Sequence, residues 1–274
     1  MGYRHSELLL DDPLVRVGDV ACRAPRSTRC SAPEYSRDTG LVLPRSGVFA
    51  VHRRGEMVAA DAATAVVLAA GEEYRVAHPA DGGDTCTVLA FAPEIAQEAL
   101  AGRGASHGTL RAATQLAAWR LTAGLRRGPG QLAAVEAAML VLDAVTVDLA
   151  AQPAASRLSP QARRRAEEVR ALLACDPAAP WRLDQVARAV HCSPFHLARQ
   201  FRAATGQTIA DHLLRLRLSL ALERIAAGET SLARLAHDLG FAHHSHLTAR
   251  FHAMFATTPS QLRTILTAHQ RSPS

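Results

Sequence analysis

The chain has 274 residues, a length typical of two globular domains. Apolar residues make up 48% of it and charged residues 20%, which excludes collagen, mucin-like stalks and wholesale disorder. The most apolar windows are shorter than a membrane span and contain acids such as Asp61, Glu136 and Asp143, so we predict no transmembrane helix. The N-terminal residues lack the basic flank and apolar stretch of a secretory signal, so we expect a cytoplasmic protein without a membrane partner.

Charge is divided unevenly along the chain. All 31 basic residues are Arg. Residues 1–152 contain 15 Arg and 17 acids, a net charge of −2, whereas residues 153–274 contain 16 Arg and 8 acids, a net charge of +8. A localised positive charge is typical of proteins that bind a polyanion, most often nucleic acid, although a solvated basic face would give the same composition.

Short apolar runs separated by turn residues predict strands at 14–17, 47–51, 64–68 and 85–91, which favours a small antiparallel sandwich or barrel. From Pro93 the apolar period lengthens toward 3.6. This predicts a short helix to about Leu100 and longer helices near 109–125 and 131–151. The last of these carries an apolar stripe that either packs on its own domain or forms a subunit interface: Leu132, Val135, Met139, Leu142 and Val145.

The proline and small residues at 152–156 indicate a linker, because they follow a helix and precede the change in charge. Ser159 and Pro160 are a helix N-cap and first helical residue, and they open an Arg-rich helix to about Leu173. We therefore predict an α+β protein of two domains. Residues 1–152 form the first, with a barrel over about 1–92 and helices over about 93–152; 153–160 form a linker, 161–265 an all-α domain, and 266–274 a frayed tail.

An internal repeat of about fifty residues lies in the second domain. The segment 183–187 (LDQVA) recurs as 232–236 (LARLA), and Leu197 with Phe201 recurs as Leu247 with Phe251. Each copy predicts a short helix, a tight polar turn and a second helix ending on a buried aromatic, which is the pattern of a helix-turn-helix. In such motifs the second helix presents its N-terminal residues to base edges in the major groove. A single helix over about 209–227 separates the copies, and we expect it to hold them about one DNA turn, roughly 34 Å, apart.

These features closely resemble the AraC/XylS family of bacterial transcription regulators. The resemblance covers the C-terminal 100 residues, and the doubled motif makes it specific. The residues that carry it are Leu183, Ala187, Ser193, Pro194, Phe195, His196, Leu197, Arg199, Phe201, Gly206, Leu213, Arg217, Ala221, Ala236, Gly240, Phe241, Phe251, Phe255, Thr258, Pro259 and Arg263.

The resemblance implies two recognition helices, at 194–201 and 243–251. In the first recognition helix, the family's groove-facing positions correspond to Phe195, His196, Ala198 and Arg199. In the second they are His244, Ser245, Thr248 and Ala249. Ala249 stands where the family often has Arg, and Arg250 follows it one position, or about 100°, further around the helix. Base contacts by the second helix are therefore expected to be weakened or shifted.

Simpler roles for these residues are also open. Phe195 could cap the core of its motif, and Arg199 could pair with an acid such as Asp184. The histidines at 243, 244 and 246 invite a metal hypothesis, but no Cys and only Asp238 lies near them in sequence, so groove or phosphate contact is favoured and no metal site is predicted there.

The resemblance also implies a cupin-like N-terminal domain that senses a small-molecule effector and dimerises, with promoter DNA and RNA polymerase as partners. No H-x-H pair or closely paired Cys appears in this half, so neither an enzymatic cupin nor a DNA-repair variant of the family is expected; the chain is predicted not to be an enzyme and to need no cofactor. The alternative is a DNA-binding or interaction module without sequence preference or effector control.

The five cysteines form no CxxC pair, so reduced thiols are expected in place of a disulfide framework. One hypothesis concerns the N-terminal half: strand ends could bring some of Cys22, Cys30, His78 and Cys86 together as a soft-metal or redox sensor, with Cys22, His78 and Cys86 as the chosen residues. Otherwise these thiols pack as small hydrophobes and the histidine faces solvent.

Overall fold

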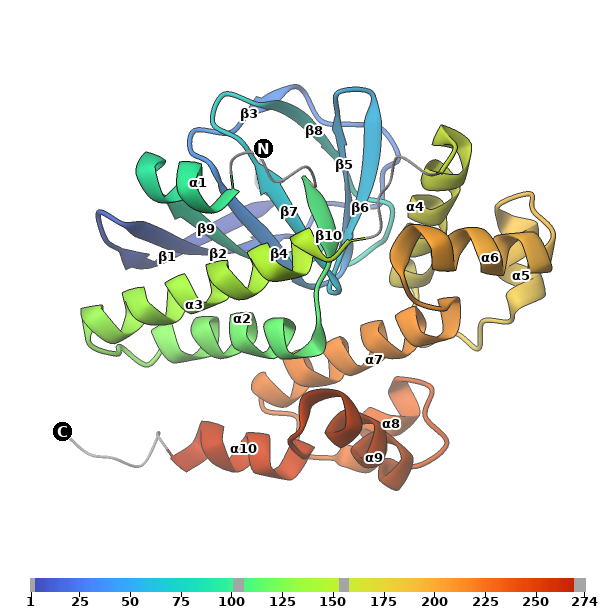
Figure 1. Cartoon of the computed structure of the whole chain (residues 1–274). Coiled ribbons are helices and arrows are strands. Elements are labelled where there is room, and N and C mark those ends of the chain that lie inside the picture. Colours follow the sequence, from blue (N-terminus) through green and yellow to red (C-terminus); the bar gives the residue numbers. More distant parts are fainter. Residues whose placement is uncertain (1–2, 101–105, 153–157, 269–274) are drawn as a thin grey trace.

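The computed structural model describes residues 3–100, 106–152 and 158–268. Two antiparallel sheets occupy the first half of the chain, and helices fill the second (Figure 1). The larger sheet has six strands in the order β1-β2-β9-β4-β7-β10, and the smaller has four in the order β3-β8-β5-β6. The strands are β1 Arg4–Asp11, β2 Val15–Cys22, β3 Glu34–Tyr35, β4 Gly40–Ser46, β5 Val48–Arg53, β6 Glu56–Asp61, β7 Thr64–Leu68, β8 Glu73–Ala77, β9 Asp84–Phe91 and β10 His107–Thr109.

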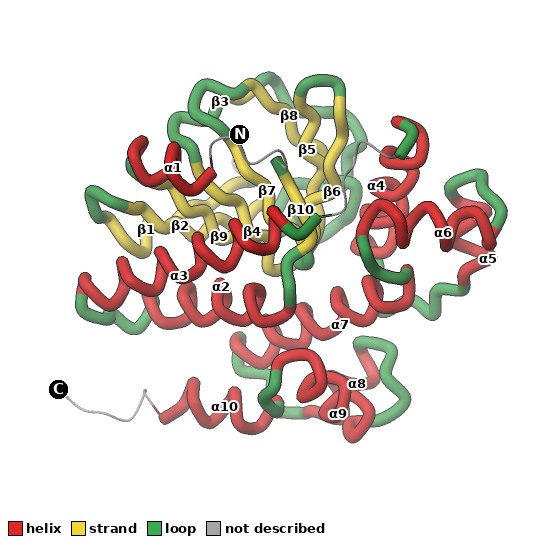
Figure 2. The backbone as a smooth tube through the Cα atoms, in the orientation of Figure 1, coloured by secondary structure: helices red, strands yellow, loops and turns green. Residues whose placement is uncertain are grey.

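Helices cover the larger sheet and form the whole C-terminal half, as the tube drawing shows (Figure 2). Helices α2 and α3 lie side by side beneath the sheets, and α7 lies below α2 (Figure 1). The helices are α1 Pro93–Leu100, α2 Ala112–Leu125, α3 Gln131–Ala150, α4 Pro160–Cys175, α5 Leu183–Ala189, α6 Pro194–Thr205, α7 Ile209–Ala226, α8 Leu232–Asp238, α9 His244–Phe255 and α10 Pro259–Ala268.

The α+β fold class, the strands at 14–17, 47–51, 64–68 and 85–91 and the helices in both halves are confirmed. The helix expected from residue 109 is wrong at its start, because 107–109 form strand β10 and α2 begins at Ala112. Gly108 lets this edge strand pack closely, because a Cβ there would lie 2.7 Å from the side chain of Gln152, just after α3. Most of the predicted linker, at 153–157, and the tail from 269 lie outside the described residues, while α10 extends to Ala268.

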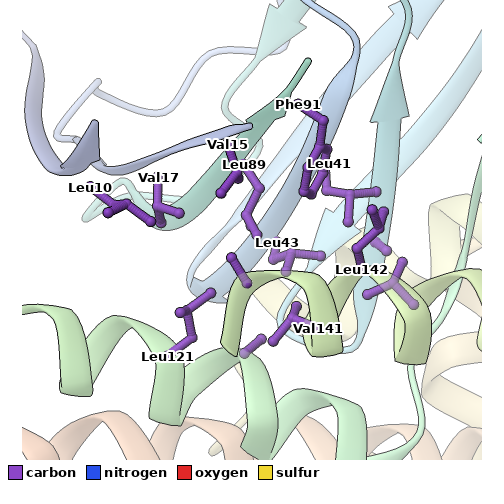
Figure 3. Close-up of a cluster of buried hydrophobic side chains, with 14 of the residues drawn as sticks. Leu10, Val15, Val17, Leu41, Leu43, Leu89, Phe91, Leu121, Val141 and Leu142 are labelled. Atoms are coloured by element: carbon purple, nitrogen blue, oxygen red, sulfur yellow. The ribbon is translucent and has the colours of Figure 1, made fainter. Parts of the chain in front are cut away.

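One buried core of the N-terminal half lies between the larger sheet and the helix pair (Figure 3), and a smaller one lies among strands β5, β6, β7 and β9. Alternate residues of the strands, such as Val15 and Val17 on β2, point toward this layer because successive side chains in a strand face opposite ways. Leu121 of α2 and Val141 and Leu142 of α3 meet them from the helical side. On α3, Val135, Leu142 and Val145 of the predicted stripe are buried, whereas Leu132 is 75% exposed.

Buried apolar clusters join the two halves of the chain. In one cluster, Val48, Ala62 and Ala80 of the sheet region pack with residues of α4 to α7. In another, Leu116 and Trp119 of α2 pack with residues of α7 to α10. The N-terminal half thus contacts both ends of the C-terminal half directly.

A buried ionic cluster reinforces this contact. Asp61, at the end of β6, is fully buried, and its carboxylate lies 3.3 Å from Arg170 Nε of α4 and 3.0 Å from His212 Nε2 of α7. Thr64 donates a hydrogen bond of 2.7 Å to the same carboxylate. Burial by itself would raise the pKa of Asp61, but Arg170 and His212 outweigh burial and hold that pKa well below its usual value of 3.8.

A second polar network ties α7 to the larger sheet. Glu223 of α7 lies 3.3 Å from Arg45 Nε of β4, and the same guanidinium lies 2.7 Å from Asp19 of β2. Arg126, just after α2, pairs with the other oxygen of Asp19. In each network, a charged side chain of the N-terminal half pairs with a side chain of opposite charge in the C-terminal half.

In the part of the chain that the structure describes, no helix is both long enough and apolar enough to cross a membrane.

Asp61→Asn is expected to lower the free energy of unfolding by about 3–5 kcal/mol, because it removes the charge that pairs with both Arg170 and His212 and leaves the buried Arg170 with Glu167 as its remaining acidic partner. Since the folded protein holds the pKa of Asp61 below 3.8, this contribution is present above that pH and is lost as the pH falls below it. Urea unfolding followed by circular dichroism at neutral and acidic pH measures both effects. The exposed Asp143→Asn should change the unfolding free energy by less than about 0.5 kcal/mol. Equal effects of the two substitutions would contradict the assigned role of Asp61.

Candidate nucleic-acid interface

The first helix pair of the repeat consists of α5 and α6. The tight turn between them closes with a 2.9 Å hydrogen bond from Cys192 N–H to the Ala187 carbonyl, and His191 takes a left-handed conformation with φ of 50°. Ser193 then caps α6 by accepting a hydrogen bond from the His196 amide, with Pro194 as the first helical residue. Local sequence thus sets both the turn and the start of the second helix.

The second pair, α8 and α9, repeats this construction. Phe241 N–H donates to the Ala236 carbonyl at 2.9 Å, and Gly240, with φ of 72°, occupies the left-handed position. His243 caps α9 through Nδ1, which accepts from the His246 amide at 3.1 Å. The repeat in the sequence is therefore a repeat in backbone geometry, although the capping side chains differ.

The same buried residues hold the two helices of each pair together. Ala187 and Ala236 are 1% and 0% exposed, and their small side chains let the helices approach closely. The second helices contribute buried leucine and phenylalanine at matching positions: Leu197 and Phe201 on α6, and Leu247 and Phe251 on α9. The predicted core positions of the repeat are confirmed.

The predicted groove-facing residues of α6 lie on its outer face. Phe195 is 73% exposed, and the Arg199 guanidinium stacks over its ring, 5.6 Å from the ring centre. His196 is also exposed, and Ala198 is half-buried. Phe195 therefore does not cap the core of its motif.

Asp184 is paired with two other arginines on its own side of the turn. Arg188 lies 2.9 Å and Arg182 3.4 Å from its carboxylate. The stacking on Phe195 holds the exposed Arg199 side chain along the outer face of α6.

On α9, His244, Ser245, Ala249 and Arg250 are exposed, and Thr248 is half-buried. Arg250 Nε donates toward His246 Nε2 at 3.5 Å. The His243 and His246 rings lie 6.1 Å apart, and His243 Nδ1 is already used by the helix cap. This arrangement uses the histidines as helix-cap and surface groups.

Helix α7 connects the two pairs as one uninterrupted helix. Thr208 and Asp211 form a capping box at its start. Further along, Arg217 donates to the carbonyls of Pro177 at 2.6 Å and Ala179 at 2.8 Å, before α5, and to that of Gly240 at 3.2 Å, in the turn before α9. A single side chain thus anchors the loop that leads into one pair and the turn inside the other.

Of the N-terminal residues that the sequence singled out, the structure brings Cys22 and His78 into contact, whereas Cys86 packs in a buried apolar cluster and Cys30 is exposed. Cys22 Sγ lies 3.5 Å from His78 Nε2, and Cys86 Sγ donates to Asp84 at 3.3 Å. Burial raises the pKa of the Cys22 thiol and, more strongly, that of Cys86. Sequence reasoning missed Asp84, whose signal was its place just after the Gly-Gly turn and two residues before Cys86.

Comparison with known proteins places this geometry in a family. A helix-turn-helix domain model matches residues 186–265. SoxS of Escherichia coli K12 is 33% identical over 84 residues, which are 31% of this chain and 78% of SoxS. An AraC-like transcription regulator of Streptomyces antibioticus is 32% identical over 88 residues, but the match spans only 29% of that relative. The crystal structure of ToxT from Vibrio cholerae O395 aligns with 97% of this chain and 99% of its own at 12% identity, with a TM-score of 0.37.

The paired helices define a helix-turn-helix protein. The chain belongs to the AraC/XylS family of transcription regulators.

Ala256 ends α9 in the left-handed region with φ of 53°, where the first repeat has Gly206 with φ of 75°. This conformation is unfavourable for a residue with a Cβ. Ala256→Gly should therefore raise the free energy of unfolding by about 0.5–1 kcal/mol, measured by urea or thermal unfolding. Ala253→Gly, at an exposed position inside α9, should lower it by about 1 kcal/mol. Destabilisation by Ala256→Gly would show that the C-terminal end of α9 is not strained.

Proposed function

We propose that the chain is a sequence-specific regulator that binds promoter DNA through both recognition helices, α6 and α9. The observation that carries the proposal is the duplicated helix pair, which buries its apolar face and exposes the N-terminal residues of each second helix. In proteins that bind DNA in this way, those residues contact base edges in the major groove. Phe195, His196, Ala198 and Arg199 would act on one side, and His244, Ser245, Thr248, Ala249 and Arg250 on the other.

The connecting helix supports binding to successive grooves. Its 18 residues span about 27 Å at 1.5 Å per residue. Its first half, with Leu213 and Leu216, packs with α5 and α6, and its second half, with Leu218 and Ile225, packs with α8 and α9. Recognition elements that contact successive major grooves on one face of DNA lie about 34 Å apart. A helix of this length, with the recognition helices beside it, suits that spacing.

Each proposed recognition helix carries exposed arginine. Arg199 and Arg202 are exposed on α6, and Arg250 on α9. Arg199 can donate two parallel hydrogen bonds to guanine, whereas arginines near the phosphates contribute affinity that falls as salt rises.

We further propose that a small-molecule effector acts through the N-terminal domain, residues 1–152. Helix α4 contacts β5, β6 and α6, and α2 contacts α9, so each recognition helix is linked to the N-terminal half through a neighbouring helix. An effector that changes this packing would change the placement of the recognition helices and hence DNA affinity.

A homodimer and contact with RNA polymerase complete the proposal. The support for a dimer is an exposed apolar row on α3, where Leu132 is 75% exposed, Leu140 70% and Val147 46%. Steps of eight and seven residues keep these side chains on one face of a helix.

Binding without sequence preference is the competing function. A competition experiment separates the two: fragments recovered from genomic DNA with the purified chain are challenged with random duplex at physiological salt. A regulator should prefer its own sites by about 10³-fold or more, whereas a non-specific binder should show no preference.

Arg199→Ala is expected to weaken binding to the selected site by about 1–3 kcal/mol and to relax base preference at one position. Binding curves for the site and for its single-base variants measure both effects. Arg127→Ala removes the same charge from the exposed turn between α2 and α3, away from either recognition helix, and should leave base preference unchanged. An unaltered preference in Arg199→Ala would contradict the assignment of this residue.

A further inference from the structure

We propose that Cys22, His78 and Asp84 bind a divalent transition-metal ion of the zinc class, and that this ion is the effector. The second part rests on the proposed function, whereas the first does not. Thiolate, imidazole and carboxylate together are a ligand set suited to zinc.

The register of the larger sheet brings two of the three ligands together. Cys22, the last residue of β2, is the direct cross-strand partner of Asp84, the first residue of β9. Directly opposed residues in an antiparallel pair have Cβ atoms about 4.5–5.5 Å apart on the same face. Cys86 lies two residues after Asp84 and therefore points to the same side of the sheet as Asp84.

The third ligand comes from the smaller sheet. His78 follows β8, and its backbone forms an isolated antiparallel bridge with Ser27 in the segment after β2. One ligand atom from each of Cys22, His78 and Asp84 lies within 4.8 Å of the others. Because zinc bonds are about 2.0–2.3 Å long, tetrahedral ligands lie roughly 3.3–3.7 Å apart, so only a small inward movement is needed.

A glycine turn makes this approach sterically feasible. The chain passes from His78 to Asp84 through Gly82 and Gly83, both with positive φ. A Cβ on Gly83 would lie 1.7 Å from the Cys22 carbonyl oxygen, so only glycine lets the turn pack against the end of β2.

The electrostatics of the cluster also point to a cation. Asp84 is 5% exposed, and its Oδ1 lies 3.2 Å from His78 Nδ1 without forming an aligned hydrogen bond. Neither of these buried atoms has another hydrogen-bond partner among the described residues. The other carboxylate oxygen of Asp84 accepts a hydrogen bond from the Cys86 thiol, which fixes the carboxylate in place. A buried carboxylate oxygen that lacks a hydrogen-bond partner is stabilised by a bound cation.

The cluster lies next to the DNA-binding half. Pro79 and Ala80 follow His78 directly; the Pro79 carbonyl lies 3.5 Å from Cys175 Sγ at the end of α4, and Ala80 belongs to the buried cluster shared with α4. In the structure the His78 ring faces Cys22 with Nε2 and Asp84 with Nδ1. An ion takes only one of these nitrogens, so drawing the three ligands inward around it would alter the contact of the other nitrogen and shift the segment that contacts α4.

Metal binding is tested on the full chain, stripped with a chelator and kept reduced. Calorimetry with Zn²⁺ should give one site per chain, and Co²⁺ should give a thiolate charge-transfer absorption band. Cys22→Ser and His78→Gln should each weaken Zn²⁺ binding by about 100-fold or more, and Cys86→Ala by about 10–100-fold through the carboxylate that it positions. The exposed Cys30→Ser is the matched control and should bind like the parent chain. Equal Zn²⁺ affinity in Cys22→Ser and Cys30→Ser would overturn the site.

The effector role is tested with DNA fragments recovered as described above. Zn²⁺ should change the affinity of the parent chain for them by at least about fivefold, and not that of Cys22→Ser. Zinc binding without a change in DNA affinity would overturn the effector role and leave the site intact. A chain that binds Zn²⁺ but shows no preference for any DNA would contradict the proposed function and still support the metal site.

Discussion

The arrangement of the two halves depends on one buried carboxylate. Asp61 ends a strand of the smaller sheet, yet its two strongest partners, Arg170 and His212, lie on α4 and α7 more than a hundred residues later. A buried charge is costly unless it is paired, so separating the halves would expose or orphan three ionisable groups at once. Apolar contacts on either side, from Ala62 to α4 and from Trp119 to α7, exclude water from this interface.

This constraint gives the connecting helix two roles. On one side α7 packs with both helix pairs, and Arg217 ties their loops to it. On the other side it is held to the sheets through His212 and through Glu223, whose carboxylate pairs with Arg45. Because a helix is stiff over this length, a shift of α7 relative to the sheets would move both helix pairs together. The proposed metal cluster lies at a second contact, between the 78–84 segment and α4, and therefore acts on the same interface.

The basic charge of the C-terminal half is only partly available to DNA. Arg170 is buried against Asp61, Arg217 is used by backbone carbonyls, and Arg224 and Arg234 share Glu229, lowering the pKa of that carboxyl to about 2. A net charge counted along the sequence gives all of these equal weight. The exposed arginines of α6 and α9 are fewer than the arginines of the whole C-terminal half. They support the proposal that DNA is contacted by these two helices.

Much of this protein follows from its sequence alone. The repeat at 49 to 50 residues, with its alanines, leucines and phenylalanines at helical spacing, determines two helix pairs, because local turns, caps and periodicity are encoded within a few residues of each other. The exposure of Phe195 beside Arg199 and the pairing of Asp61 with Arg170 and His212 were decided only by the tertiary structure. The same holds for Asp84 opposite Cys22, because cross-strand register joins residues 62 positions apart. Such contacts depend on how distant segments pack, and no local pattern records the partner.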